Sequence, residues 1–197
     1  IKDIDSGKIG LYGLSQGGWV APLAASLCRD IDFLITISAP GITPDEQNSF
    51  VVNNIVQKEI RKVYEKSEWG KYLSPADING LDSINNVKSK SEYGETEVVK
   101  GFSWYDPIPA WQKINIPVLA VWGSADEIVP SFESMNRIQS ALSNNKNCTF
   151  RIFEGANHIM KMPEVKDKFA GKWEMTAPGS GEFILEWFRN IVLTRKK

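Results

Sequence analysis

The chain has 197 residues, of which 42% are hydrophobic, and this length leads us to expect one globular domain rather than two. Its 23 basic and 24 acidic residues nearly cancel, so the charge indicates neither nucleic acid nor an anionic membrane surface as a partner. One histidine and two cysteines cannot supply the usual nitrogen and sulfur ligands of a zinc site, and we expect neither a metal nor a cofactor.

The first predicted elements are a strand and the helix that follows it. Residues 8–14 form a short apolar run that ends in a glycine-rich turn, which is typical of a buried strand. The next apolar residues have the i, i+3, i+4, i+7 spacing of one helix face: Val20, Leu23, Ala24 and Leu27. Pro22 lies inside this helix and removes one backbone donor, so we expect a bend or a lost hydrogen bond there.

Three more strands and two more helices follow in alternation. Residues 33–38, 117–123 and 149–153 are predicted buried strands. The apolar spacing predicts a helix through Met135, Ile138 and Leu142, and a closing amphipathic helix through Ile184, Trp187, Phe188 and Ile191. This alternation predicts an α/β fold with a mostly parallel sheet and helices on both faces.

Residues from about 43 to 105 interrupt the alternation. A helical apolar stripe there is followed by polar sequence rich in glycine and serine, and we interpret the segment as an insertion within one domain of residues 1–197. The stripe is Val52, Ile55, Val56, Ile60 and Val63. Four aromatic residues are pocket candidates, although buried packing is the more common role: Trp69, Tyr72, Trp104 and Tyr105.

The two cysteines lie far apart in different patterns. Cys28 falls in the apolar helical pattern and Cys148 at the start of a predicted strand. Both positions favour buried small hydrophobic residues over a disulfide.

Gly13-Leu14-Ser15-Gln16-Gly17 is a G-x-S-x-G motif between a predicted strand and a predicted helix. A sharp turn there would hold Ser15 in a strained conformation, with glycines two residues to either side to avoid Cβ clashes. The backbone N–H of Gln16 would begin the helix and point toward a developing oxyanion. The alternative is a chance glycine-rich turn, which the flanking elements disfavour.

A serine nucleophile needs a base, and the base needs an orienting acid. His158 is the only histidine and follows the predicted strand 149–153 on a loop. Asp126, after the strand 117–123, completes the order Ser, Asp, His. Glu127 is its immediate rival and Asp106 a weaker one, while a turn or helix cap is the structural alternative for Asp126.

The three segments together resemble the catalytic segments of the α/β-hydrolase superfamily, in particular its bacterial esterase and serine-aminopeptidase-like members. They read Gly-Leu-Ser-Gln-Gly-Gly-Trp, Trp-Gly-Ser-Ala-Asp-Glu-Ile-Val-Pro and Glu-Gly-Ala-Asn-His. The resemblance implies Ser15 as acyl acceptor, His158 as general base and then acid, Asp126 as the orienting acid, and the Gln16 N–H as one oxyanion-hole donor. It also implies a helical cap in the insertion, and a second oxyanion donor upstream of the nucleophile that has no counterpart here.

The resemblance further implies that the N-terminal strands of the fold are missing, and we expect Ile1 to continue a longer chain. No apolar run reaches about 18 residues, so no membrane span is predicted. The favoured function is a serine hydrolase that cleaves a small carboxylic ester through an acyl-serine intermediate. The alternatives are a serine peptidase or amidase acting on small peptides, and an inactive binding module. The sequence indicates neither the compartment nor the oligomeric state.

Overall fold

The computed structural model describes residues 8–66, 104–162 and 176–194. The chain divides into two compact units. One consists of Ile1–Ile42 together with Asp106–Lys197, and the other of Thr43–Tyr105.

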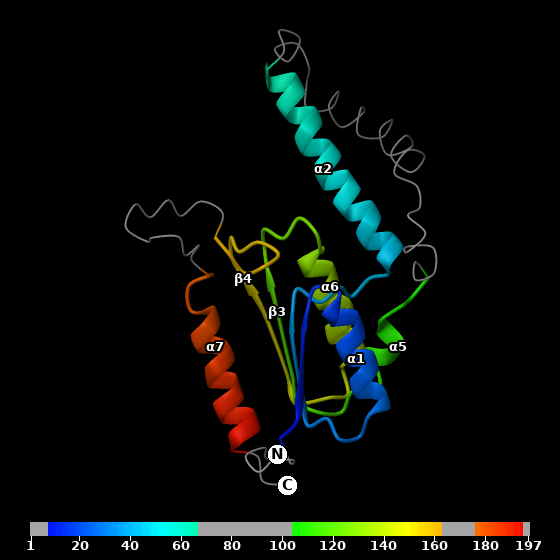
Figure 1. Cartoon of the computed structure of the whole chain (residues 1–197), viewed down its shortest axis with the longest axis vertical. Coiled ribbons are helices and arrows are strands. Elements are labelled where there is room, and N and C mark those ends of the chain that lie inside the picture. Colours follow the sequence, from blue (N-terminus) through cyan, green and yellow to red (C-terminus); the bar gives the residue numbers. More distant parts are fainter. Residues whose placement is uncertain (1–7, 67–103, 163–175, 195–197) are drawn as a thin grey trace. The chain divides into compact units, whose positions relative to one another are not determined.

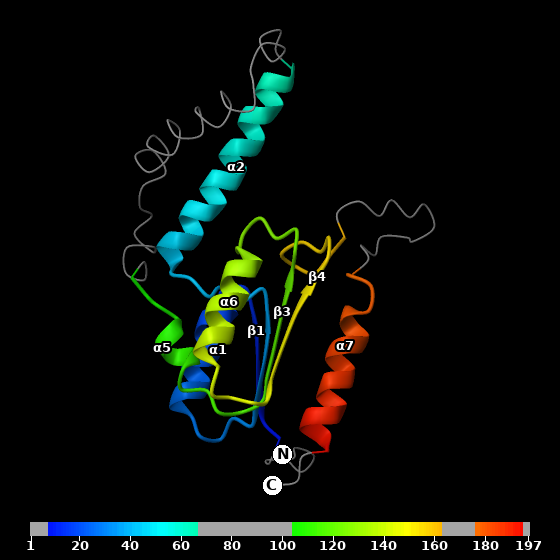
Figure 2. The same cartoon turned by 180° about the vertical axis from the view of Figure 1, so that it is seen from behind.

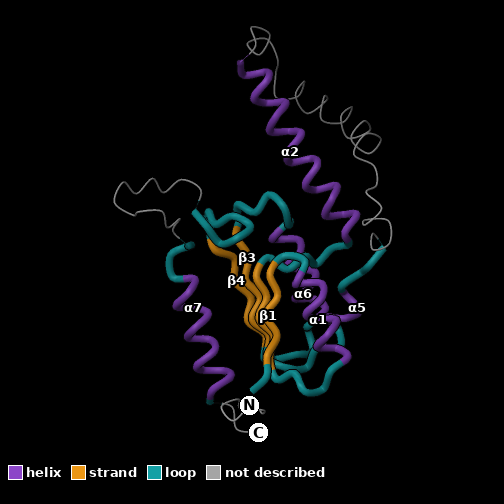
Figure 3. Tube along the Cα trace, viewed as in Figure 1, coloured by secondary structure: helices purple, strands orange, loops and turns teal. Residues whose placement is uncertain are grey.

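The first unit contains a four-stranded sheet whose strands lie in the order of the sequence (Figure 3). The strands are β1 (Gly10–Leu14), β2 (Phe33–Ile37), β3 (Val118–Gly123) and β4 (Cys148–Phe153). All three neighbouring pairs are parallel. The predicted strands and their parallel arrangement are therefore confirmed, and the carboxyl ends of all four strands meet at one edge of the sheet.

Helices cover both faces of this sheet, as predicted (Figures 1 and 2). On one face lie α1 (Gly17–Leu27), α5 (Ile108–Trp111) and α6 (Ser131–Ala141). On the other face lies α7 (Ser180–Trp187), which continues as the π-helix η2 (Phe188–Leu193).

The core consists of one layer on each face of the sheet, because alternate residues of a strand point to opposite faces. In β3, Val118 and Ala120 face the α1/α6 layer, while Leu119 and Val121 face the α7 layer. Every residue of β3 is buried, which fits its position between β2 and β4. The continuous apolar run from which this strand was predicted thus reflects burial on both faces.

Helix α1 packs on the sheet through its small residues rather than through the apolar stripe noted in the sequence. Its buried positions are Gly18, Trp19, Ala21 and Pro22. Val20 is 60% exposed and Leu27 is 76% exposed. Small side chains let the helix backbone approach the strands closely, and of the larger apolar residues only Trp19 is buried, while Val20 and Leu27 are exposed. The helix continues through Pro22.

The two cysteines are free, and one of them contradicts the sequence prediction. Cys28 is exposed, because it is the residue at which α1 ends rather than a residue of the buried face. Cys148 is half-buried and packs against the α1/α6 layer of the core. Desolvation by this burial raises the pKa of the Cys148 thiol to about 11.

The second unit contains the long helix α2 (Pro44–Lys66), which confirms the helix predicted from the stripe at 52–63. A reciprocal capping box begins it: the Thr43 N–H donates to Glu46 Oε2 at 2.7 Å, and the Glu46 N–H donates to Thr43 Oγ1 at 3.2 Å. Within the described ranges, no helix combines the length and apolar character that crossing a bilayer requires.

The aromatic pocket candidates of this segment have different outcomes. Trp104 is 76% exposed and Tyr105 is half-buried. Trp69 and Tyr72 lie outside the described residues, as do the side chains of Ile55, Val56, Ile60 and Val63. A role of this unit as a cap stays a prediction.

Candidate active site

Ser15 occupies a strained turn between β1 and α1. Its φ is 54°, in the left-handed region that residues with a Cβ rarely adopt. Its N–H donates to the carbonyl of Ile37 at 2.9 Å, and its carbonyl accepts from the N–H of Gly18 at 2.7 Å. The backbone of the neighbouring strand therefore fixes the turn that presents Ser15 at the carboxyl edge of the sheet.

Two glycines near this turn sit where a Cβ would clash, Gly13 and Gly18, but only Gly13 was predicted to do so. A Cβ on Gly13 would lie 2.4 Å from the carbonyl oxygen of Gly17. A Cβ on Gly17 itself would meet nothing within 4 Å among the described residues, so the prediction for that glycine was wrong. The close approach occurs one residue later, where a Cβ on Gly18 would lie 2.4 Å from the Cβ of Ala39.

The start of α1 offers hydrogen-bond donors to an anion. Gln16 immediately precedes the helix and provides no side-chain cap, and the first turn carries no acidic residue. Within the described part of the chain, the Gln16 N–H has no hydrogen-bond partner. The partial positive charge of a helix N-terminus is thus available beside Ser15.

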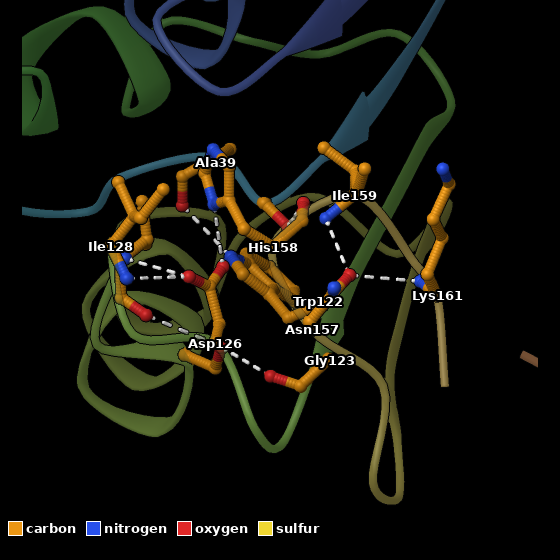
Figure 4. Close-up of polar contacts among 12 residues, drawn as sticks. Ala39, Trp122, Gly123, Asp126, Ile128, Asn157, His158, Ile159 and Lys161 are labelled. Carbon is orange, nitrogen blue, oxygen red and sulfur yellow. Dashed lines mark hydrogen bonds and ion pairs between the residues drawn. The ribbon is translucent and has the colours of Figure 1, made fainter. Parts of the chain in front are cut away.

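Asp126 and His158 form a buried pair (Figure 4). The Nδ1 of His158 lies 2.8 Å from Oδ2 of Asp126, and the two side chains are 13% and 0% exposed, respectively. The other carboxylate oxygen, Oδ1, accepts from the N–H groups of Ile128 at 2.8 Å and Val129 at 2.9 Å. With the carboxylate ionised and acting only as an acceptor, Nδ1 carries the imidazole proton, which leaves Nε2 free to accept one.

The two rival acids are placed differently. Glu127 is exposed, and Oδ1 of Asp106 accepts from the Ile108 N–H at 2.9 Å at the start of α5. Of the three candidate carboxylates, Asp126 alone pairs with His158 in the described residues.

Several hydrogen bonds join the loop that carries Asp126 to the end of β4 and the loop that carries His158. The N–H of Ser124 donates to the carbonyl of Phe153, and the N–H of Ala125 donates to the carbonyl of Ala156, both at 2.9 Å. The N–H of Gly155 donates to Ser124 Oγ at 2.8 Å. These contacts hold the acid and the base together independently of their own ion pair.

Two further polar residues, Ser38 and Asn157, hold the histidine loop and were missed by sequence reasoning; Asn157 is labelled in Figure 4. Ser38 Oγ donates to the carbonyl oxygen of His158 at 2.8 Å. The side-chain oxygen of Asn157 accepts from the N–H groups of Ile159 at 3.1 Å and Lys161 at 2.9 Å. The asparagine in a small-residue loop was a signal for such a turn, whereas nothing marked Ser38.

The structure therefore places all three proposed triad residues at the same edge of the sheet and brings two of them into contact. Ser15 follows β1, Asp126 follows β3 and His158 follows β4. Among the described residues, the Ser15 hydroxyl makes no hydrogen bond, so its link to His158 is not formed in this conformation. Catalytic hydrogen bonds of this kind often tighten only when substrate binds.

Comparisons with known proteins agree with this architecture. The family described as BAAT / acyl-CoA thioester hydrolase C terminal matches residues 2–168. DcsB, solved in complex with a substrate analogue, superposes with a TM-score of 0.52 at 18% identity, over 98% of this chain and 67% of its own. An esterase of Pyrococcus furiosus gives a TM-score of 0.53 at 17% identity, over 94% of this chain and 55% of its own. Both show that the fold is that of an α/β-hydrolase, of which this chain spans part. No curated protein sequence matches the chain.

Proposed function

This chain belongs to the BAAT/acyl-CoA thioester hydrolase C-terminal family, and from that premise we propose that it is a serine hydrolase of carboxylic esters or thioesters. The observation that carries the proposal is the buried Asp126–His158 pair at the edge where Ser15 occupies its strained turn. A nucleophile, a base and an orienting acid are the groups that acyl transfer through a covalent intermediate requires.

In the proposed acylation step, Ser15 Oγ attacks the carbonyl carbon of the substrate while its proton moves to Nε2 of His158. The negative charge that develops on the carbonyl oxygen lies beside the Gln16 N–H at the start of α1. Collapse of the tetrahedral intermediate breaks the bond to the alcohol or thiol, and the imidazolium returns the proton to the leaving group. Water then repeats the sequence on the acyl-serine and releases the acid.

Asp126 has a passive but essential part in this proposal. Its Oδ2 fixes the His158 tautomer that leaves Nε2 basic, and its negative charge stabilises the imidazolium. Because Oδ1 is held by two backbone N–H groups, the carboxylate cannot rotate away from the imidazole.

Covalent labelling tests whether Ser15 is the nucleophile. We expect a fluorophosphonate probe to form an adduct on Ser15 that is lost in Ser15→Ala. Ser26→Ala is the matched control, since Ser26 is a partly exposed serine of α1 whose hydroxyl donates only to the carbonyl of Leu23 in the described chain. A folded wild-type chain that forms no adduct would overturn the proposal in favour of an inactive binding module.

A substrate panel tests the reaction class. Short-chain p-nitrophenyl esters, acyl thioesters and aminoacyl amides are compared by kcat/KM. We expect esters and thioesters to react faster than amides, with Ser15→Ala lowering kcat by about 10⁶-fold, as in complete triads. Faster turnover of the amides would replace this proposal with a serine peptidase or amidase.

A further inference from the structure

The base has to cross the sheet to reach the nucleophile. His158 follows β4, and Ser15 follows β1, which is three strands away. At about 4.8 Å per strand, this separation is about 14 Å along the edge of the sheet. The histidine loop must therefore extend back over the ends of β3 and β2, and something must hold it there.

Ser38 holds the loop at the end of β2. It is the first residue after that strand, is fully buried, and donates through Oγ to the His158 carbonyl at 2.8 Å. Because β2 is the immediate neighbour of β1, this hydrogen bond fixes the backbone of His158 one strand spacing from the nucleophile strand.

The backbone around Ser38 is hydrogen-bonded on both sides, to the turn after β1 and to β3. The carbonyl of Ile37 accepts from the N–H of Ser15, and the N–H of Ser38 donates to Val121 of β3 at 2.8 Å. Trp122 Nε1, at the end of β3, donates to the carbonyl of Ala39 at 2.8 Å. The two-residue turn Ser38–Ala39 thus contacts the strands that carry the nucleophile and the acid, and the loop that carries the base.

The backbone conformation of Ser38 is one that glycine would adopt more easily, which indicates that the serine side chain has a role. Its φ is 49°, where a residue with a Cβ is strained and glycine is not. The Cβ is what supports the hydroxyl that reaches His158. A hydroxyl used to hold the loop explains why the strained residue carries a side chain.

We propose that Ser38 is a positioning residue that aims the His158 imidazole at Ser15 through its hydrogen bond to the His158 carbonyl. The inference rests on the proposed hydrolase function, since it assigns Ser38 a part in the same reaction. The hydroxyl of Ser38 bonds the backbone carbonyl of His158, so in this proposal Ser38 acts through the histidine backbone.

The test uses two Ser38 variants and one control. Ser38→Gly removes the hydroxyl and also relieves the strained φ, so it keeps the fold, while Ser38→Ala removes the hydroxyl alone. Thr36→Val is the matched control, because Thr36 lies two residues earlier in β2, is equally buried, and has a hydroxyl with no partner within the described structure.

The decisive readout is the imidazole ring, because His158 is the only histidine of the chain and its ¹⁵N–¹H ring signals need no assignment. In the wild type and in Thr36→Val, we expect a protected Nδ1–H signal from the pair with Asp126. In both Ser38 variants we expect that signal to broaden or to exchange with water. An unchanged ring spectrum in Ser38→Gly, or the same change in Thr36→Val, would overturn the proposal.

Kinetics supply the second readout. We expect both Ser38 variants to lower kcat by about 10- to 100-fold with little change in KM, since displacing a catalytic group by about 1 Å has an effect of that size. An unchanged kcat would overturn the positioning role. A wild-type chain that hydrolyses no substrate would refute the proposed function, and the ring spectrum would still decide whether Ser38 positions His158.

Discussion

Asp126 shows how much of a site can depend on the charge of one side chain. Its two oxygens accept from two backbone N–H groups and from His158. An asparagine has the same shape, but its amide nitrogen is a donor and cannot accept the Nδ1 proton. We expect Asp126→Asn to stabilise the wrong histidine tautomer and to lower kcat by about 10⁴-fold.

Steady-state kinetics on the fastest substrate of the panel measure this effect. Glu127→Gln is the matched control, because Glu127 is the exposed neighbouring carboxylate, and we expect it to retain most of the wild-type kcat. A large loss in Glu127→Gln with a small loss in Asp126→Asn would make Glu127 the acid.

Gly13 and Gly17 provide a second matched pair at the residue scale. The carbonyl of Gly17 leaves no room for a Cβ on Gly13, so we expect Gly13→Ala to lower the free energy of unfolding by about 1–3 kcal/mol. Gly17→Ala places its methyl group in open space among the described residues. We expect it to be neutral or to stabilise the helix by up to about 1 kcal/mol. Urea unfolding followed by circular dichroism measures both values, and equal losses would contradict the steric argument.

The two free thiols differ in reactivity for a physical reason. Burial raises the pKa of Cys148 to about 11, so little thiolate forms at about pH 8, whereas Cys28 is exposed. We expect iodoacetamide to alkylate Cys28 first and Cys148 much more slowly until the chain is unfolded, as mass spectrometry of the digested chain will show. Rapid labelling of both thiols in the folded chain would contradict this expectation.

The same pKa shift makes a small contribution to stability that depends on pH. The raised pKa means that the folded state favours the neutral thiol. The contribution is therefore fully present below the usual thiol pKa of 9.0 and is lost progressively above it.

At the scale of the elements, β3 is joined to the end of β2 by a buried indole. Trp122 and Trp111 are both fully buried, but only the Nε1 of Trp122 has a partner in the described structure, the carbonyl of Ala39. Trp122→Phe therefore leaves that carbonyl unpaired, whereas Trp111→Phe removes an unpaired donor. We expect Trp122→Phe to be the more destabilising of the two by about 1–3 kcal/mol. Denaturant unfolding of the two variants measures this difference, and equal stabilities would argue against the hydrogen bond.

The elements were largely predictable because their apolar patterns are strong. The strand now seen at Val118–Gly123 was visible as a continuous apolar run, and the closing helix as a periodic one. The buried face of α1 was not visible, since three of its four buried residues, Gly18, Ala21 and Pro22, carry little hydrophobic signal. A helix face is recognised in a sequence by its large apolar side chains, whereas a helix that packs closely on a sheet carries small side chains on the buried face.

The residues of the candidate site that belong to sequence motifs were predictable. The elbow and the lone histidine pointed to Ser15 and His158, and the order of the segments pointed to Asp126 over more distant acids. Which of Asp126 and Glu127 pairs with His158 could be seen only in the coordinates, because adjacent residues of a loop cannot be ranked by spacing. Ser38 was beyond sequence reasoning, since its contact lies 120 residues away along the chain.

At the scale of the whole molecule, the edge of the described sheet at β1 carries exposed apolar residues. β1 is an edge strand of the described sheet, and large apolar residues are exposed on it and on α1. They include Tyr12, Leu14, Val20 and Leu27. An edge strand beside an apolar surface is a template for pairing with another chain. We expect this 197-residue chain by itself to self-associate as its concentration rises.

Sedimentation velocity over a range of concentrations measures this association. We expect the double variant Val20→Lys/Leu27→Lys to weaken it, because both positions are exposed on α1. Leu185→Lys is the control, since Leu185 is 55% exposed on α7, on the opposite face of the sheet. Association that responds to Leu185→Lys and not to the double variant would place the contact on the α7 face.

The chain is anchored in the sheet unit just before the segment 43–105 and again just after it. Trp19 Nε1 donates to the carbonyl of Ile42 at 3.0 Å where the segment departs, and Trp111 of α5 is fully buried in the core where it returns. The hydrogen bonds that hold Asp126 and His158 among the described residues come from residues of the sheet unit itself. The segment between these two places can therefore change in length or sequence as a separate evolutionary module. The same two places are natural junctions for recombination in the laboratory.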